Sequence, residues 1–391
     1  MEVGIIGKLC TKLLIHTIIK IRFIMQAKLY VLFFLFSLLF SCREGKIIVK
    51  NMNGEEKSVQ EIDVFFQNLI DSLEMPGLSV AIINDSKIVY KNSFGVTSLN
   101  TNNPVTEKTI FEAASLSKPV FAYFVMKQVE KGLLNLDKPL YEYLPYPDIE
   151  YDERAKLITA RMILLHSSGL PNWRQDSLKI EFMPGTNYQY SGEGYEYLSM
   201  VLAKINNVSL NSLDSIFQVE VSNQIDAKRL YFNWNNDIAT NKATGHTNNE
   251  PTTNGKDYKD DNFSAAGGLH TDIASYANFL ISIFDNSLLE SGLQTEMLNK
   301  QIDLPTDDIN KLLIGASGWS LGFGILLADN SLCYFHGGNN DDFQSWMHFY
   351  PEKKYGIVLF SNSDKVQSPE FFSIFFDFMN DGISFDFSKL N

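Results

Sequence analysis

Strand-like segments lie near both ends of this chain, and helix-like segments lie between them. Apolar residues over 78–83 and 87–92 flank Asn84-Asp85-Ser86, a turn sequence typical of a β-hairpin. Strand signals return near the C-terminus, at 324–327, 332–336, 344–350 and 355–361. This order predicts an α/β protein of the α+β kind, in which both chain ends build one antiparallel sheet flanked by helices, with a helical subdomain inserted between the two groups of strands.

Two helices are predicted beside this sheet. Apolar side chains recur at helical spacing from Glu61 to Leu73, where Pro76-Gly77 ends the pattern. A second amphipathic helix is predicted over 369–379. Between roughly 115 and 300, helix-like stretches alternate with polar loops, of which 247–262 has no aliphatic side chain to bury.

The first 41 residues differ from the rest, because they carry a net charge of +4 while the whole chain carries −13. Residues 29–40 are apolar apart from Ser37. Twelve helical residues rise only about 18 Å, which is too short for a hydrocarbon core about 30 Å thick. A basic residue, a short apolar run and a small residue form the order of a secretory signal. Since Cys42 follows at once, Leu39-Phe40-Ser41-Cys42 resembles a bacterial lipobox, in which the cysteine is lipidated and becomes the mature N-terminus.

These features predict an N-terminal extension with a lipoprotein signal peptide over 1–41, a tether over 42–60 and a folded domain over 61–391. We therefore expect an exported protein held at the cell envelope by a lipid on Cys42, either periplasmic or at the outer membrane. A signal anchor and a chance cysteine are the alternatives. Met25 begins a complete signal peptide by itself, so it is a second candidate start.

Charge and spacing exclude several classes of function. With 46 acidic against 33 basic residues, the chain does not attract phosphate backbones, so no nucleic-acid partner is expected. The six histidines and three cysteines lack the spacing of metal ligands. Phosphate-binding and dinucleotide-binding glycine motifs are absent, so neither a metal nor a cofactor is predicted.

One short motif carries the chemistry: Ser115-Leu116-Ser117-Lys118 opens an apolar helical stripe that ends before Gly132. Pro119 lacks an N–H and is tolerated only in a first turn, which places the helix start at about Ser115. Residues three apart share a helix face, so the Lys118 ammonium can reach the Ser115 hydroxyl. The alternative is that Ser115 merely caps a core helix and Lys118 is solvated.

From about Pro76 to Asp364, the chain resembles the serine β-lactamases and penicillin-recognising DD-peptidases, especially their class C-like branch with its esterases. The resemblance lies in an ordered series of segments: PGLSVAIINDSKIVYKNSFG, TIFEAASLSK, KGLLNLDKPLYEYLP, ITARMILLHSSGLP, PGTNYQYSGEGYEYL, SAAGGLHT and FHGG. It implies the β-lactamase/transpeptidase fold for the domain over 61–391 and a catalytic serine.

The resemblance also implies roles for individual residues. Ser115 would be the nucleophile that forms an acyl-enzyme, and Lys118, with a pKa depressed by desolvation, would activate it. Tyr190 matches the tyrosine that shuttles a proton to the leaving group, and a phenol needs a neighbouring cation such as Lys118 to do so near neutral pH. His336-Gly337-Gly338 matches the strand motif that lines the pocket, with glycines that let substrate approach. Asn339, the next residue, would contribute its backbone N–H, with that of Ser115, to an oxyanion hole.

Two positions depart from the family pattern. Gly192 stands where the tyrosine motif usually ends in Asn, so a side-chain amide that contacts substrate is missing, and Glu193 is a candidate to fill part of that gap. His336 stands where β-lactamases carry lysine. Imidazole has a pKa near about 6.5, so His336 is a poor permanent anchor for a substrate carboxylate and predicts a pH–rate limb near neutrality.

We therefore expect a metal-independent serine hydrolase that acts on an ester or amide, either a D-amino-acid or peptidoglycan-like peptide or a small ester. A true β-lactamase and a non-catalytic peptidoglycan-sensing protein of the same fold are the alternatives. Of the remaining residues, His166, His270 and His348 are predicted to be structural, and Cys333 is predicted to be a buried strand residue. Three tryptophans are predicted to pack in the core, with the lining of a pocket as the alternative: Trp173, Trp319 and Trp346.

Overall fold

The computed structural model describes residues 48–252, 262–286 and 289–390, together with four single positions: His16, Lys20, Arg22 and Met25. The chain divides into one unit over Met1–Ile47 and a second over Ile48–Asn391. Cys42 and nearly all of the predicted signal segment lie outside the described residues. Over the described ranges, we find no helix with both the length and the apolar character needed to cross a membrane.

The second unit is built on an antiparallel sheet of eight strands in the order β10-β11-β12-β13-β14-β15-β3-β4. These strands are β3 (Gly77–Asn84), β4 (Lys87–Gly95), β10 (Ile302–Asp303), β11 (Gly318–Trp319), β12 (Gly324–Ala328), β13 (Ser331–Asn339), β14 (Gln344–Tyr350) and β15 (Tyr355–Ser361). The C-terminal β15 pairs with the N-terminal β3, with Ile357 opposite Ile82. The prediction of one antiparallel sheet from both chain ends is therefore confirmed.

The remaining strands form three small sheets: β1 (Ile48–Lys50) with β2 (Glu56–Ser58), β5 (Phe111–Glu112) and β6 (Leu230–Tyr231) with β9 (His270–Thr271), and β7 (His246–Thr247) with β8 (Glu250–Pro251). The β1–β2 hairpin lies inside the segment predicted to be a tether. Val49 is buried in the core, and the Asn51 amide donates a hydrogen bond to the carbonyl of Met379. The described part of the fold thus already includes Ile48, earlier than residue 61.

The α-helices are α2 (Val59–Ser72), α3 (Ser117–Glu130), α4 (Ala160–Leu164), α5 (Gly192–Ile205), α6 (Leu213–Glu220), α7 (Asn236–Asn241), α8 (Ile273–Phe284), α9 (Ser291–Leu298), α10 (Ile309–Ile314) and α11 (Pro369–Met379). Short 3₁₀ turns lie at η1 (Ala114–Leu116), η2 (Leu140–Glu142), η3 (Pro147–Ile149), η4 (Glu153–Leu157), η5 (Leu210–Ser212), η6 (Ser222–Gln224), η7 (Pro351–Lys353) and η8 (Phe387–Leu390). Helix α2 begins with a capping box, in which the Ser58 hydroxyl accepts from the Glu61 N–H and the Glu61 carboxylate accepts from the Ser58 N–H. Helices form most of the regular secondary structure of the inserted segment between β4 and β10, as predicted, and the short strands β5 to β9 also lie there.

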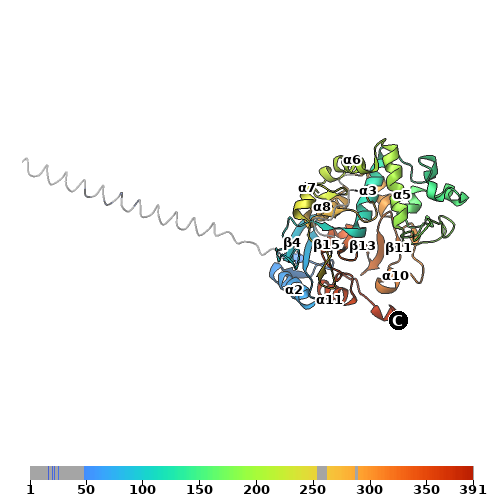
Figure 1. Cartoon of the computed structure of the whole chain (residues 1–391). Coiled ribbons are helices and arrows are strands. Elements are labelled where there is room, and N and C mark those ends of the chain that lie inside the picture. The colour runs from blue at the N-terminus through green and yellow to red at the C-terminus, as the bar shows by residue number, and fades with distance from the viewer. Residues whose placement is uncertain are drawn as a thin grey trace, which may run out of the picture. The chain divides into compact units, whose positions relative to one another are not determined.

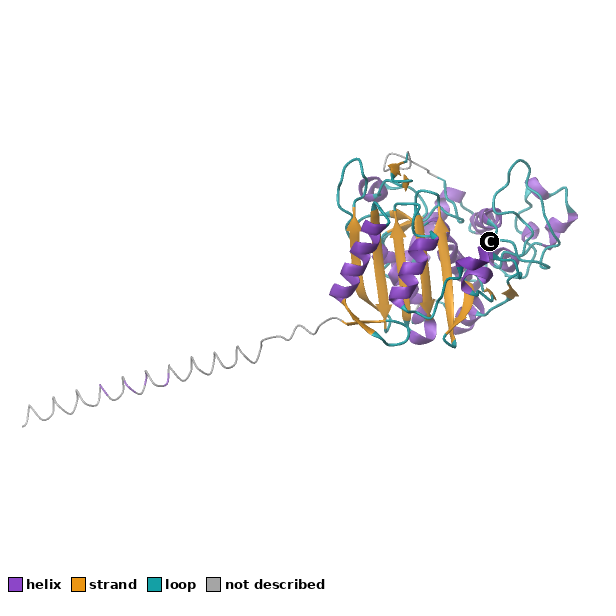
Figure 2. Cartoon of the chain, turned by 90° about the horizontal axis from the view of Figure 1, so that it is seen from below, coloured by secondary structure: helices purple, strands orange, loops and turns teal. Residues whose placement is uncertain are grey.

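Helices cover both faces of the large sheet (Figure 1), and the strands β3, β14 and β15 are buried on both sides. Leu359 of β15 packs with α2 and α11 in one apolar cluster, whereas its neighbour Val358 packs with α3 and α8 in the other. Figure 2 views the sheet with helices lying across its near face. Successive side chains of a strand point to opposite faces, which explains why the central strands are apolar at nearly every position.

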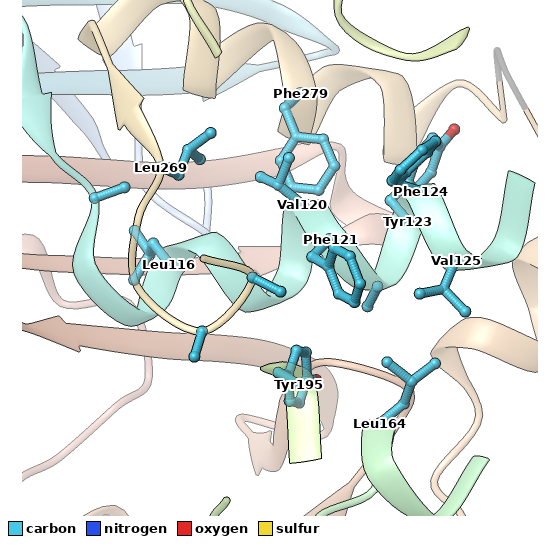
Figure 3. Close-up of a cluster of buried hydrophobic side chains, with 14 of the residues drawn as sticks. Leu116, Val120, Phe121, Tyr123, Phe124, Val125, Leu164, Tyr195, Leu269 and Phe279 are labelled. Atoms are coloured by element: carbon cyan, nitrogen blue, oxygen red, sulfur yellow. The ribbon is translucent and has the colours of Figure 1, made fainter. Parts of the chain in front are cut away.

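Helix α3 is buried nearly all round, and apolar side chains from several elements surround it (Figure 3). The Phe121 ring lies 6.0 Å from that of Tyr195 on α5, and the Tyr123 ring lies 5.7 Å from that of Phe279 on α8. The helix ends at Glu130, and Gly132 follows with a positive φ of 72°, as the predicted stop requires. The N-terminus of α3 is therefore fixed in position by packing along the whole helix.

A buried polar cluster connects the β1–β2 hairpin to the segment that follows α11. The Asp381 carboxylate accepts hydrogen bonds from the Tyr355 hydroxyl at 2.6 Å and from the Met52 N–H at 3.3 Å. His348 Nδ1 accepts from the Trp346 indole N–H, so its Nε2 carries the proton and donates to Asp381 at 3.1 Å. His348 thus has the structural role predicted for it.

Removing the Asp381 carboxylate should destabilise the fold, because three buried donors would lose their acceptor at once. We expect Asp381→Ala to lower the free energy of unfolding by about 3 kcal/mol, since each unsatisfied buried group costs about 1–3 kcal/mol. Asp377→Ala, at an exposed position of α11, is the control and should change it by less than about 0.5 kcal/mol. Equal urea midpoints for the two variants would contradict this role of Asp381.

Candidate active site

Ser115 lies in η1, the 3₁₀ turn that leads directly into α3. Pro119 is the third residue of the α-helix, so its missing N–H falls among donors that a first turn leaves unpaired. The Ser117 hydroxyl donates to the Ala114 carbonyl at 2.6 Å and accepts from the Leu269 N–H at 2.9 Å. These bonds hold Ala114 at a φ of +49°, a strained conformation directly before Ser115.

Lys118 is buried one helical turn after Ser115. Its Nζ lies 3.1 Å from the Ser115 Oγ and donates to the Ala266 carbonyl at 2.7 Å. Burial lowers the pKa of Lys118 from 10.5 to about 7, although the Glu196 carboxylate opposes that shift. An appreciable fraction of the amine is therefore neutral at physiological pH and able to accept the Ser115 proton.

Glu196 is a site residue that the sequence analysis missed. Its carboxylate accepts hydrogen bonds from the Ser264 hydroxyl at 2.6 Å and from the Ala266 N–H at 3.0 Å. It therefore orients the same residue whose carbonyl holds the Lys118 ammonium. Burial raises the pKa of Glu196. A single glutamate on a helix has no sequence signal that separates it from a surface carboxylate.

Tyr190 lies across the Lys118 amine, which is 4.7 Å from the centre of its ring. The ring of His166 packs against Tyr190 at 4.3 Å, and His166 Nδ1 accepts from the Ser191 N–H at 3.0 Å. Burial raises the pKa of Tyr190, although a hydrogen bond with the Ser115 side chain lowers it. The phenol thus stays protonated near neutral pH, so it is placed to donate a proton.

Strand β13 brings the His336-Gly337-Gly338 motif against η1. A β-carbon on Gly338 would lie 2.5 Å from the Ala113 carbonyl oxygen and 2.2 Å from the Ser345 Oγ. Gly338 therefore admits the backbone that precedes Ser115, rather than substrate as predicted, while Gly337 lines the cavity beside Ser115.

His336 is buried and neutral. Its Nδ1 donates to the Gly337 carbonyl at 2.7 Å, which leaves the Nε2 lone pair without a hydrogen-bond partner among the described residues. Burial and the nearby Lys118 lower the pKa of His336 to about 3. The prediction that His336 titrates near neutrality is therefore wrong, because the sequence does not reveal that this imidazole is desolvated beside an amine.

A cavity of about 590 Å³ opens beside Ser115, with Tyr190, His336 and Asn339 in its lining. A second cavity of about 520 Å³ shares Asn339 and Asp341 with the first. Trp319 and Trp346 are buried as predicted, and they also line the first cavity. Trp173 is 53% exposed and lines the second cavity, so its predicted place in the core is wrong.

Gly192 has no space for a side chain. A β-carbon there would lie 2.8 Å from the Asn172 carbonyl oxygen and 2.9 Å from the Trp173 ring. The Gly192 N–H donates to the Asn172 Oδ1 at 3.1 Å, and Asn172 lines the cavity beside Ser115. Glu193, the candidate to fill the gap, instead forms a two-pronged ion pair with Arg174.

The remaining predicted residues are buried in the fold. Cys333 is a buried residue of β13, as predicted, and His166 and His270 are also buried. In the part of the chain that the structure describes, no three side chains of His, Cys, Asp or Glu come together as a metal site. The groups available for chemistry are thus a serine hydroxyl, a buried amine, a phenol and a neutral imidazole.

Comparison with known proteins agrees with this geometry. A family model described as Beta-lactamase matches residues 62–371. The protein named flp from Staphylococcus aureus strain MRSA252 is 22% identical over 336 residues, which cover 80% of this chain and 64% of that protein. The chain thus spans slightly less than two thirds of the length of that relative.

Solved structures share the fold at low sequence identity. The octameric penicillin-binding protein homologue from Pyrococcus abyssi superposes with a TM-score of 0.68 at 21% identity, covering 82% of this chain and 76% of that one. The D-alanine carboxypeptidase AmpC from Burkholderia cenocepacia gives a TM-score of 0.65 at 19% identity, covering 78% and 94%.

The pH dependence of acylation should follow Lys118. Because the amine must be neutral to take the Ser115 proton, we expect kcat/KM for an ester to rise with pH through a midpoint near 7. Glu196→Gln keeps the hydrogen-bond acceptor but removes the charge that raises the pKa of Lys118, so the midpoint should move to lower pH. Glu153→Gln, on an exposed 3₁₀ turn, is the control.

His336→Gln should keep this ascending limb, because His336 is already neutral over the measured range. A limb lost in His336→Gln, or unmoved in Glu196→Gln, would contradict the assignment to Lys118.

Restoring the family's usual residue should not improve this site. Gly192→Asn places a β-carbon against the Asn172 carbonyl, so we expect lower thermal stability and at least a tenfold loss in kcat/KM. Gly132→Asn is the control, since a β-carbon there meets no neighbour and asparagine tolerates its positive φ. A more active Gly192→Asn enzyme would contradict this account of position 192.

Proposed function

The chain belongs to the beta-lactamase family, and on that premise we propose that it is a serine hydrolase that cleaves an ester or amide through an acyl-enzyme on Ser115. The observation that carries the proposal is the Ser115–Lys118 pair, with 3.1 Å between Oγ and Nζ and a Lys118 pKa of about 7. A solvated surface lysine would keep a pKa above 10. Burial therefore gives this pair a base that works at neutral pH.

In the proposed mechanism, neutral Lys118 takes the Ser115 proton while Oγ attacks the carbonyl carbon. The backbone N–H groups of Ser115 and Asn339 would stabilise the oxyanion. Tyr190 then gives its proton to the departing oxygen or nitrogen and recovers one from Lys118. Water, activated by the same groups in reverse, would release the acid and regenerate Ser115.

We expect the substrate to be a small ester or a peptide of D-amino acids like those of peptidoglycan. The neutral state of His336 supports an ester, or a peptide bond whose leaving group has no free carboxylate, over efficient β-lactam hydrolysis, because it removes the permanent cation that a carboxylate would pair with. A true β-lactamase remains the second candidate, since a class C beta-lactamase is among the structures that share the fold. A peptidoglycan-sensing protein without turnover is the third, and Gly192 is the feature that favours it.

The proposed setting is the cell envelope. The basic leader, the short apolar run over 29–40 and Cys42 support export and attachment to the membrane by a lipid. Lipid attachment would hold the hydrolase near envelope substrates.

Active-site labelling tests the proposal. We expect a fluorophosphonate probe to label the wild-type protein and not Ser115→Ala, and kcat/KM for p-nitrophenyl acetate to fall by at least about 1,000-fold in that variant. Ser373→Ala is the matched control, because Ser373 is an exposed serine of α11 outside the lining of the cavity beside Ser115 and should not react.

A fluorescent penicillin, tested on the wild-type protein and the same variants, distinguishes between the candidate functions. Slow or absent penicillin turnover with measurable ester hydrolysis supports the esterase or peptidase, whereas rapid turnover supports the β-lactamase. Failure of both probes to label the wild-type protein would sink the hydrolase proposal and leave the sensing protein.

A further inference from the structure

The cavity beside Ser115 continues away from the nucleophile between α10, α11 and the C-terminal segment around η8. Its far walls are apolar and aromatic, and they include Ile309, Leu313, Phe372, Phe385 and Phe387. The Phe385 ring stacks on Phe372 at 4.7 Å and on Phe387 at 4.5 Å. The Asp386 N–H donates to the Leu313 carbonyl at 2.9 Å, which fastens the C-terminal segment to α10.

No lysine or arginine is among the described residues that line this cavity, and Asp341 is the one acidic side chain among them. His336 is neutral because its pKa is lowered to about 3. A carboxylate bound here would have no cation to replace its hydration and would meet the negative charge of Asp341. An uncharged apolar group would instead gain free energy from leaving water.

The position of Tyr190 decides which part of a substrate enters. Tyr190 lines this same cavity, and it is the protonated acid of the site. A leaving oxygen or nitrogen must lie within hydrogen-bond reach of the acid that protonates it. A leaving group within reach of Tyr190 would therefore enter this cavity toward its apolar far walls, with the acyl group directed away from them.

Together these observations specify the leaving group of the substrate, which goes beyond the proposed hydrolase activity and depends on it. The geometry points to a leaving-group site for an uncharged alkyl or aryl alcohol or amine that has no free carboxylate. In the acylation step the bond between the acyl carbon and the leaving atom breaks, and the bond from that carbon to the Ser115 Oγ forms. The leaving atom takes a proton from Tyr190, which the Ser115 proton replaces through Lys118.

Two series of esters test the assignment, with the wild-type protein first shown to be labelled at Ser115 by a fluorophosphonate. In the first series the acid is acetate and the alcohol grows from ethyl to hexyl, so the leaving-group pKa stays nearly constant. We expect kcat/KM to rise about threefold to fourfold per methylene, which is the factor that burying one methylene gives. In the second series the alcohol is ethanol and the acid grows, and we expect a much weaker dependence on length.

A carboxylate on the alcohol provides the charge test. We expect 6-acetoxyhexanoate, which carries a carboxylate at the end of a chain as long as that of hexyl acetate, to react at least tenfold more slowly. Leu313→Lys places an ammonium in the cavity and should lower the ratio of kcat/KM for hexyl acetate over 6-acetoxyhexanoate by at least tenfold. Ile309→Lys, at a position already 48% exposed, makes the same change with less risk to folding.

Leu332→Lys is the matched control, since Leu332 is an exposed leucine of β13 outside the cavity lining, and the ratio should not change in it. A flat alcohol series, a length dependence confined to the acyl series, or a preference for 6-acetoxyhexanoate would each overturn the leaving-group site while leaving the hydrolase intact. Absence of fluorophosphonate labelling would overturn the hydrolase itself, and the leaving-group site with it.

Discussion

The burial of the Lys118 amine is the constraint on which the rest of the site depends. Lowering its pKa from 10.5 to about 7 means that the charged form is about 5 kcal/mol less favourable than in water. This net cost is present even though the Ala266 carbonyl, the Ser115 hydroxyl and the face of Tyr190 all contact the amine. Glu196 supplies the compensating charge at longer range.

Except for Ser115, these contacts come from distant parts of the chain, and this explains why α3 has to be buried nearly all round. Packing of Phe121 against Tyr195 of α5 places α5, and with it Tyr190 and Glu196, beside the first turn of α3. Pairing of β15 with β3 joins the C-terminal strands to the N-terminal hairpin in one sheet. Strand β13 can approach η1 closely because Gly338 has no side chain. The contacts that stabilise the fold therefore also position the residues of the site.

Much of the fold followed from local patterns. The predicted strands at 344–350 and 355–361 and the helix at 369–379 match β14, β15 and α11, because continuous apolar runs between turns leave few alternatives. The short strands β10 and β11 and the hairpin β1–β2 were missed, since two or three residues carry no periodicity. The prediction that Trp173 packs in the core was wrong for a related reason, because neighbouring residues in the sequence do not show whether an aromatic side chain is buried by distant segments.

Local sequence patterns are sufficient to predict the order of the longer strands and helices, the candidate pair Ser115–Lys118 and the two departures at positions 192 and 336. These properties are local, because hydrogen bonding within a helix and alternation along a strand depend on neighbouring residues. The packed structure is needed to show that the pKa of His336 is lowered to about 3, that Glu196 belongs to the site and that Asn172 occupies the space beside Gly192. Desolvation and steric exclusion depend on segments far apart in the chain, so the protonation states of the site exist only once those segments have packed together.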